Sequence, residues 1–432
     1  MVWGMIPGES RIDGWTSRIL RQDPGFRRLY VIGNRSVPTH DWVRLFKAIE
    51  GTSVLLELGL SGVPLEASAV EALANALILN RSLRVLAVGD QSFNDYHLSI
   101  LSEGLVKNSS LRDLDLRNKL LTSVSSFYLA KVFGAAENSD LKILRLSGNC
   151  IESVGLNALV NFQTTFGLEE LYVDSCGIKD STDIFCQTLS DSFPELRVLS
   201  ISRNPLNKKS WQLLAQSIKT VTFLRTFEAV DSNLEAEEAQ ALLLNSGSFL
   251  KSLSLGSNKI GTFVLDSFLR EKAVAQMLET LDFRACELND EFMLQFSQCS
   301  TLGLFPKLSS LILSDNQVSS FGINRIECLG IISSLALFNN PLLGPGAADA
   351  LIALSKRVDM RNLKSIDIGA CKIEIQDLLE LGSNLSSREW SHLEELCVAA
   401  NPGCNDEKWK VTNAELRITR PDLDVIWTLQ RE

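Results

Sequence analysis

Three histidines and nine cysteines are the side chains of this 432-residue chain best suited to nucleophilic, acid–base or metal chemistry. The three histidines, His40, His97 and His392, lie far apart in the chain, and none is aligned with a serine or cysteine nucleophile. No Cys-x-x-Cys pair exists, and Cys397 with Cys404 lacks the second ligand pair that zinc requires. The sequence therefore predicts no catalytic residue, no metal site and no cofactor.

The dominant pattern in the chain is structural. The motif L-x-x-L-x-L-x-x-N/C-x-L returns about every 28 residues between Phe26 and Cys404, as in LKILRLSGNCI from Leu141 and LKSLSLGSNKI from Leu250. The first position of the fourteen copies is held by Phe26, Leu55, Leu83, Leu111, Leu141, Leu168, Leu196, Leu224, Leu250, Leu278, Leu308, Ile332, Leu363 and Leu393. A truncated fifteenth copy is expected at Leu423. Repetition of this kind predicts a leucine-rich-repeat solenoid.

Each repeat predicts one short strand and one helix. The leucines of the L-x-L core point inward and the residues between them point outward. Parallel strands need a crossover, and the segments Val70–Asn80 and Ser210–Lys219 have the apolar spacing of the helices that would supply it. The expected fold is therefore α/β: a curved horseshoe with parallel strands on the concave face and helices on the convex face.

A ladder of small polar residues follows the strands. A buried Asn at this position can bond the backbone groups that the bend leaves unpaired. The ladder reads Asn149, Cys176, Asn204, Ser232, Asn258, Cys286, Asn316, Asn340, Cys371 and Asn401. It departs from consensus at Val63, Gln91 and Lys119, and the step from Asn316 to Asn340 shortens to 24 residues. The short step indicates either a shortened convex helix or a local change of curvature that shapes a docking site.

With its long α/β units and alternating Asn and Cys, the chain resembles the ribonuclease-inhibitor-like subfamily of leucine-rich repeats over about 400 residues. That subfamily is intracellular and includes ribonuclease inhibitor, the Ran GTPase-activating protein, tropomodulin-like actin regulators and the sensor regions of NOD-like receptors. The resemblance implies a protein-binding solenoid. In the Ran activator, loops at the strand ends of early repeats carry an important arginine, and Arg117 is the nearest candidate here.

The ends of the chain have the character of caps. Residues 1–25 carry Trp3 and Trp15, residues 405–432 carry Trp409 and Trp427, and the solenoid is expected between them at 26–404. The scattered cysteines and the absence of a signal-peptide pattern favour a cytoplasmic protein, with nuclear or cytoskeletal association left open. Four Asn-x-Ser/Thr sequons are weak evidence for glycosylation; they begin at Asn34, Asn80, Asn108 and Asn384. Asn34 also falls on a ladder position.

Charge narrows the class of partner. The net charge of −10 disfavours nucleic-acid binding, and no apolar run is long enough to span a membrane. The outward positions of the predicted strand face hold twelve acidic and five basic residues, a net charge of −7. The acidic ones are Glu57, Asp90, Asp113, Asp115, Glu170, Asp174, Glu228, Asp231, Asp282, Asp315, Asp367 and Glu395. The basic ones are Arg28, Arg117, Arg145, Arg203 and Arg284. Such a face either attracts a basic partner or is merely solvated.

The function expected from the sequence is a non-enzymatic scaffold that binds a protein with a basic surface on its acidic concave face, without nucleic acid, membrane insertion or a small-molecule substrate. The residues predicted to bind are Asp113, Asp115, Arg117, Arg145, Glu170, Tyr172, Asp174 and Arg203, because charge and aromatic character concentrate there. Two alternatives remain open: a GTPase activator resembling the Ran activator, and a ribonuclease-inhibitor-like or immune-sensor-like binding protein.

Overall fold

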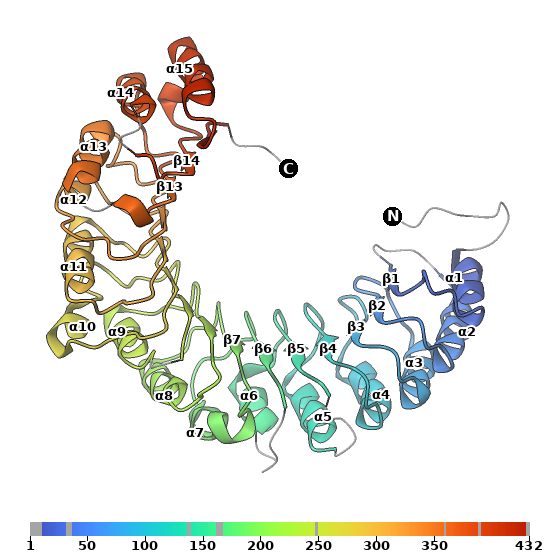
Figure 1. Ribbon diagram of the computed structural model, residues 1–432. Helices are drawn as coiled ribbons and strands as arrows, with labels where there is room; N and C mark the ends of the chain where they lie inside the picture. The colour runs from blue at the N-terminus through green and yellow to red at the C-terminus, as the bar shows by residue number, and fades with distance from the viewer. Residues whose placement is uncertain are drawn as a thin grey trace. The chain divides into compact units, whose positions relative to one another are not determined.

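The computed structural model describes residues 11–31, 37–135, 140–160, 167–246, 249–357, 360–387 and 390–428. The chain divides into two compact units, residues 1–224 and residues 225–432. Trp3 and Asn34 lie outside the described residues. In each unit the strands line one face and the helices line the other (Figure 1). The predicted leucine-rich-repeat solenoid is confirmed.

The first unit holds seven parallel strands in chain order, each paired with the next. The strands are β1 (Arg28–Tyr30), β2 (Glu57–Gly59), β3 (Val85–Ala87), β4 (Asp113–Asp115), β5 (Ile143–Arg145), β6 (Glu170–Tyr172) and β7 (Val198–Ser200). The helices are α1 (Arg11–Leu20), α2 (Thr39–Glu50), α3 (Ala67–Leu79), α4 (Asp95–Val106), α5 (Ser123–Phe133), α6 (Glu152–Val160), α7 (Asp183–Ser192) and α8 (Lys208–Ile218).

The second unit repeats this plan with eight parallel strands. The strands are β8 (Thr226–Glu228), β9 (Ser252–Ser254), β10 (Thr280–Asp282), β11 (Ser310–Ile312), β12 (Ser334–Ala336), β13 (Ser365–Asp367), β14 (Glu395–Cys397) and β15 (Asp424–Ile426). The helices are α9 (Ala236–Leu244), α10 (Asp266–Glu271), α11 (Asp290–Thr301), α12 (Ser320–Asn324), α13 (Ala347–Arg357), α14 (Ile375–Ser386) and α15 (Glu407–Thr419), with 3-10 turns η1 (Met360–Asn362) and η2 (Pro402–Asn405). The truncated repeat at Leu423 thus supplies a fifteenth strand.

The core of each repeat lies between its strand and its helix. Leu111, Leu114 and Leu116 of the fourth repeat are fully buried, and so is Leu129 of helix α5. The residues on either side of Leu114 in strand β4 are half-buried and face outward, as the L-x-L pattern requires.

Both predicted helices begin earlier than the apolar spacing indicated. Helix α3 begins at Ala67 and not at Val70, because the first turn precedes the first residue of the apolar stripe. Helix α8 begins at Lys208 and not at Ser210, because the side chain of Asn207 caps it by accepting a hydrogen bond from the Ser210 amide at 2.8 Å.

The asparagine ladder forms as predicted. The side-chain amide of Asn204 donates to the carbonyls of Val173 and Ile201 at 2.8 and 2.9 Å, and its oxygen accepts from the amides of Cys176 and Ile178 at 2.9 and 3.1 Å. The ladder cysteines make weaker hydrogen bonds to the backbone than the asparagines do. The Cys176 thiol donates to the Leu146 carbonyl at 3.3 Å, and burial raises the pKa of that thiol to about 12. These ladder thiols are structural.

The short step between Asn316 and Asn340 coincides with helix α12, which has only five residues. The structure therefore supports the first of the two interpretations, a shortened helix. Asn340 still donates to the carbonyls of Leu313 and Leu337, both at 2.9 Å, so the ladder continues through the short repeat.

The division into caps stays a prediction. Trp409 of helix α15 is fully buried and lies against Gly382 of helix α14, whereas Trp15 and Trp427 are half-buried. These contacts account for Trp409 as a packing residue.

Candidate functional site

The register of four strands brings the predicted binding residues together on the outward face of the first unit. Asp113 of β4 is aligned with Ile143 of β5 and Glu170 of β6. In the next row, Asp115 is aligned with Arg145, Tyr172 and Ser200 of β7. We call the set Asp113, Asp115, Arg117, Arg145, Glu170, Tyr172, Asp174 and Arg203 the strand-face patch.

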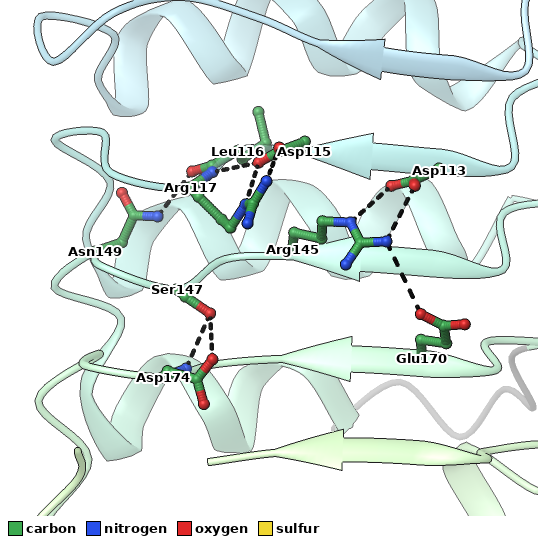
Figure 2. Close-up of polar contacts among 9 residues, drawn as sticks. All are labelled: Asp113, Asp115, Leu116, Arg117, Arg145, Ser147, Asn149, Glu170 and Asp174. Carbon is green, nitrogen blue, oxygen red and sulfur yellow. Dashed lines mark hydrogen bonds and ion pairs between the residues drawn. The ribbon is translucent and has the colours of Figure 1, made fainter. Parts of the chain in front are cut away.

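Arg145 lies at the centre of the strand-face patch. Figure 2 shows its guanidinium reaching from β5 toward β4, where its Nε and Nη2 donate to the two Asp113 oxygens at 3.3 and 3.2 Å. Nη2 lies 3.9 Å from Glu170, and the guanidinium carbon lies 4.7 Å from the centre of the Tyr172 ring. The Tyr172 hydroxyl in turn donates to Glu170 at 2.8 Å. One arginine thus joins three strands.

Arg117 folds back onto Asp115 in the adjacent row (Figure 2). Its Nε and Nη2 donate to the two carboxylate oxygens at 3.0 and 2.6 Å, and its amide donates to the same carboxylate at 3.0 Å.

The two aspartates of β4 respond differently to these contacts. Burial would raise the pKa of Asp115, but the hydrogen bonds and charge of Arg117 hold that pKa below its ordinary value. At Asp113 burial prevails over the contacts with Arg145, and the nearby charges of Asp115 and Glu170 add to it, so the pKa is raised.

Asp174 ties neighbouring repeats together. Its carboxylate accepts hydrogen bonds from the Ser147 hydroxyl at 2.8 Å, from the Ser202 amide at 2.8 Å and from the Ser200 hydroxyl. Its acceptor capacity is therefore largely used within the protein. Sequence reasoning counted Asp174 as an acid available to a partner, whereas its contacts give it a structural role as well.

Arg203 lies three residues after strand β7, where the backbone is no longer extended. Its φ of 54° is left-handed, and its Nε donates to the Ser175 hydroxyl at 2.8 Å while the side chain stays exposed. Arg203 therefore presents its guanidinium to solvent beside the other two arginines.

A hollow of about 290 Å³ lies among these side chains. It is lined by Arg117, Asn118, Arg145, Ser147, Gly148, Tyr172, Asp174, Ser175 and Arg203. Sequence reasoning missed four of them: Asn118, Ser147, Gly148 and Ser175. A signal was present, since Asn118, Gly148, Ser175 and Arg203 hold the eighth position of four consecutive repeats, and all four have positive φ.

The acid excess on the strand face is unevenly divided between the units. The outward positions of the first unit hold six acidic and four basic residues, whereas those of the second hold six acidic residues and only Arg284. In the first unit, Arg28, Arg117 and Arg145 pair with Glu57, Asp115 and Asp113 at 2.9, 2.6 and 3.2 Å. None of the second unit's six acids makes an ion pair within the described part of the chain. Five of the seven excess negative charges on the strand face therefore belong to the second unit and two to the first.

The described residues contain no group of three or more His, Cys, Asp or Glu side chains placed to hold a metal ion. His97 stacks on Phe93 and takes part in the capping box of helix α4 with Asn94. His40 lies in the first turn of helix α2. In the same described ranges, no helix has the length and apolar character needed to cross a bilayer.

Comparisons with known proteins find similarity to a leucine-rich-repeat family, to NACHT and LRR domain proteins and to ribonuclease inhibitor. A leucine-rich-repeat family model matches residues 137–160. The chain is 27% identical over 311 residues to mouse NACHT, LRR and PYD domains-containing protein 5, covering 68% of this chain and 26% of that protein. It is 26% identical over 310 residues to pig ribonuclease inhibitor, covering 68% of this chain and 62% of the inhibitor. It thus spans about a quarter of the NACHT relative and under two thirds of the inhibitor.

Among solved structures, an internalin from Listeria monocytogenes superposes with a TM-score of 0.47 at 15% identity, over 90% of this chain and 89% of that one. A chain of the yeast Rad7 and Elc1 complex superposes with a TM-score of 0.46 at 15% identity, over 96% of this chain and 92% of that one.

Proposed function

Since the chain is a leucine-rich-repeat protein of the ribonuclease-inhibitor-like kind, we propose that it is a non-enzymatic, intracellular scaffold that binds a protein partner through the strand-face patch. The observation that carries this proposal is the meeting of eight charged and aromatic side chains on three adjacent strands, β4 to β6, and on the segments that follow β4, β6 and β7. Tyr172 and three arginines belong to the residue types that dominate binding energy at protein interfaces. A sheet face of this kind offers a firm platform because every strand is held by its neighbours.

The partner in this proposal has a basic surface. Support comes from the second unit, whose strand face carries six acids and one arginine, with no ion pair to those acids among the residues that the structure describes. Fields of one sign speed the encounter of oppositely charged proteins. The strand-face patch, with four acids and three arginines, is close to neutral and supports specific contacts more than long-range attraction.

Capture of partners by tagged full-length protein, with mass spectrometry of what is bound, tests the proposal. The test variant is the double substitution Tyr172→Ala with Arg203→Glu, and the matched control is Phe338→Ala with Arg284→Glu on the second unit's strand face. We expect the test variant to lose at least tenfold in affinity for a captured, purified partner, and the control to change it less than threefold. Unchanged binding by the test variant would overturn the proposal.

The enzymatic alternative has a direct assay. A GTPase activator of the Ran type would have to bring Arg117 to the nucleotide, whereas here Asp115 holds its guanidinium through two hydrogen bonds. We expect no stimulation of GTP hydrolysis in a panel of small GTPases. Stimulation lost in Arg117→Ala would refute the non-enzymatic proposal.

The similarity to ribonuclease inhibitor makes a ribonuclease the first named partner to test. We expect no inhibition at nanomolar concentration, because the described outward positions hold few aromatic side chains, chiefly Tyr30, Tyr172 and Phe338.

A further inference from the structure

The hollow in the strand-face patch owes its space to three small residues, Ser147, Gly148 and Ser175. Gly148 has a φ of 77°, and a Cβ there would collide with the side-chain oxygen of Asn118. A residue with a Cβ at position 148 would therefore have to displace the Asn118 side chain, which lines the same hollow. The longer side chains of Arg117, Tyr172 and Arg203 line the same space.

The hydrogen-bonding groups of the hollow are unbalanced toward donors. Asp174 is the one carboxylate among the lining residues, and three donors from Ser147, Ser200 and Ser202 already occupy it. Arg203 donates through Nε alone, and both of its Nη groups lack a hydrogen-bond partner among the described residues. Arg117 likewise keeps one Nη without a partner in that part of the chain. The hollow therefore offers unused guanidinium donors and little free acceptor capacity.

Guanidinium groups with free N–H donors bind carboxylate and phosphate oxygens with directed hydrogen bonds. A volume of about 290 Å³ holds such a group with part of the side chain that carries it. It lies at the lower limit of drug-sized ligand sites, which span about 300–1,000 Å³. Size thus favours one side chain of a larger partner over a free metabolite.

We propose that this hollow binds an anionic side chain, bearing a carboxylate or phosphate group, that projects from the partner's segment on the strand-face patch. The proposal rests on the proposed protein-binding function. Its partner combines a basic surface with one acidic anchor, which suits a chain whose donors cluster at Arg117 and Arg203 and whose free acids lie elsewhere. Because Arg117 is already paired with Asp115, we expect a short isolated peptide to bind with a Kd of about 1 mM.

The test uses full-length protein labelled with 15N-arginine and three acetylated, amidated tripeptides: Gly-Glu-Gly, Gly-phosphoserine-Gly and Gly-Gln-Gly. The Nε–H resonances of Arg117 and Arg203, assigned by substitution, report on the hollow. We expect saturable shifts of both resonances with one or both anionic peptides and none with the glutamine peptide. Response to the glutamate peptide alone identifies a carboxylate anchor, and response to the phosphoserine peptide alone identifies a phosphate anchor.

Variants make the inference falsifiable. Arg203→Gln should weaken anionic-peptide binding at least fivefold, whereas Arg284→Gln, on the second unit, should leave it unchanged. Both side chains are exposed enough that thermal melting should stay within a few degrees of the parent protein. Equal shifts with the glutamine peptide, or no shift with either anionic peptide, overturn the anchor. If partner capture still depends on Tyr172 and Arg203 in that case, protein binding stands and only the anionic anchor fails.

Discussion

Asn204 shows how much one side chain contributes to a solenoid. It is fully buried and makes five hydrogen bonds to backbone groups of two successive repeats, at 2.8 to 3.1 Å. The Ser202 carbonyl also accepts from the Ser175 amide, which leaves four groups that depend on Asn204. Each of those groups would otherwise be buried without a partner, which costs about 1–3 kcal/mol apiece. The ladder asparagines therefore hold the bend after the strand and connect repeats at the same time.

The substitution Asn204→Ala should destabilise the protein by about 3–5 kcal/mol, because it leaves two carbonyls and two amides unpaired. The matched control Cys176→Ala removes a single weak thiol bond and a small volume, and should cost about 1 kcal/mol. Denaturant unfolding followed by circular dichroism compares the two. Equal losses would show that burial alone, and not backbone pairing, decides the effect.

Some of the buried asparagines could be predicted from the sequence and others could not. The ladder after the strand was predictable, because its residues recur at a fixed place in the repeat. Asn108 was interpreted only as a sequon, and Asn80 as a sequon and the end of a helical segment. Both are fully buried, three residues before the first leucine of a repeat. The Asn108 amide donates to the carbonyls of Leu77 and Asn80 at 2.7 and 3.2 Å. Glycans are therefore excluded at both sites in the folded chain. Only two clear copies of this second ladder exist, too few to stand out as a repeat.

The pairing within the strand-face patch was not predictable for a different reason. Strand positions follow from the repeat, and so the eight residues were expected side by side. Whether Arg145 turns to Asp113, to Glu170 or to solvent depends on rotamers and on burial, which no spacing encodes. Hence a face predicted as strongly acidic contains a patch whose acids are mostly bonded.

At the level of elements, a glycine lies where helices α3 and α4 pack against each other. Gly104 of helix α4 faces the backbone of Ala74 in helix α3, and a Cβ there would collide with the Ala74 carbonyl. This close contact was not predictable from the repeat pattern, because glycine inside a helix normally counts against the helix.

Gly104→Ala should therefore lower the melting temperature even though alanine is the better helix former. Overpacking costs about 1–3 kcal/mol and exceeds the propensity gain of at most 1 kcal/mol. Gly14 of helix α1 provides the matched control, since a Cβ there meets nothing within 4 Å. Gly14→Ala should raise stability by about 0.5–1 kcal/mol. Shifts of the same sign in differential scanning calorimetry would contradict the packing argument.

At the scale of the whole molecule, the two units share one repeat but differ in charge. Composition predicted a net −7 on the strand face, but only the structure shows which acids are neutralised by neighbours. The first unit pairs three of its four outward arginines with acids, while the second leaves six acids without ion pairs in the described residues. In the proposed function, the strand-face patch makes the specific contacts and the strand face of the second unit supplies the long-range attraction.

This division predicts how salt affects association. If the second unit's strand face attracts a basic partner, the on-rate should fall steeply between 50 and 500 mM salt while the off-rate changes little, because charges outside the contact act mainly on encounter. Replacing Asp282, Asp315 and Asp367 by Asn removes three of those charges and keeps one acceptor oxygen on each side chain. That oxygen suffices for the bonds from the Asn339 side chain and the Gly369 amide, whereas Asp282 keeps one acceptor for its two donors, the Ser254 hydroxyl and the Arg284 amide.

Stopped-flow or biosensor kinetics with the captured partner should show a shallower salt dependence for that triple variant. The control replaces three exposed helix glutamates, Glu271, Glu380 and Glu415, by Gln, which changes the net charge by the same amount on the helix side of the second unit. If net charge alone steers the partner, both triple variants will slow association equally. A larger effect of the aspartate variant locates the steering field on the strand face, and an on-rate independent of salt would leave those acids with no role beyond solvation.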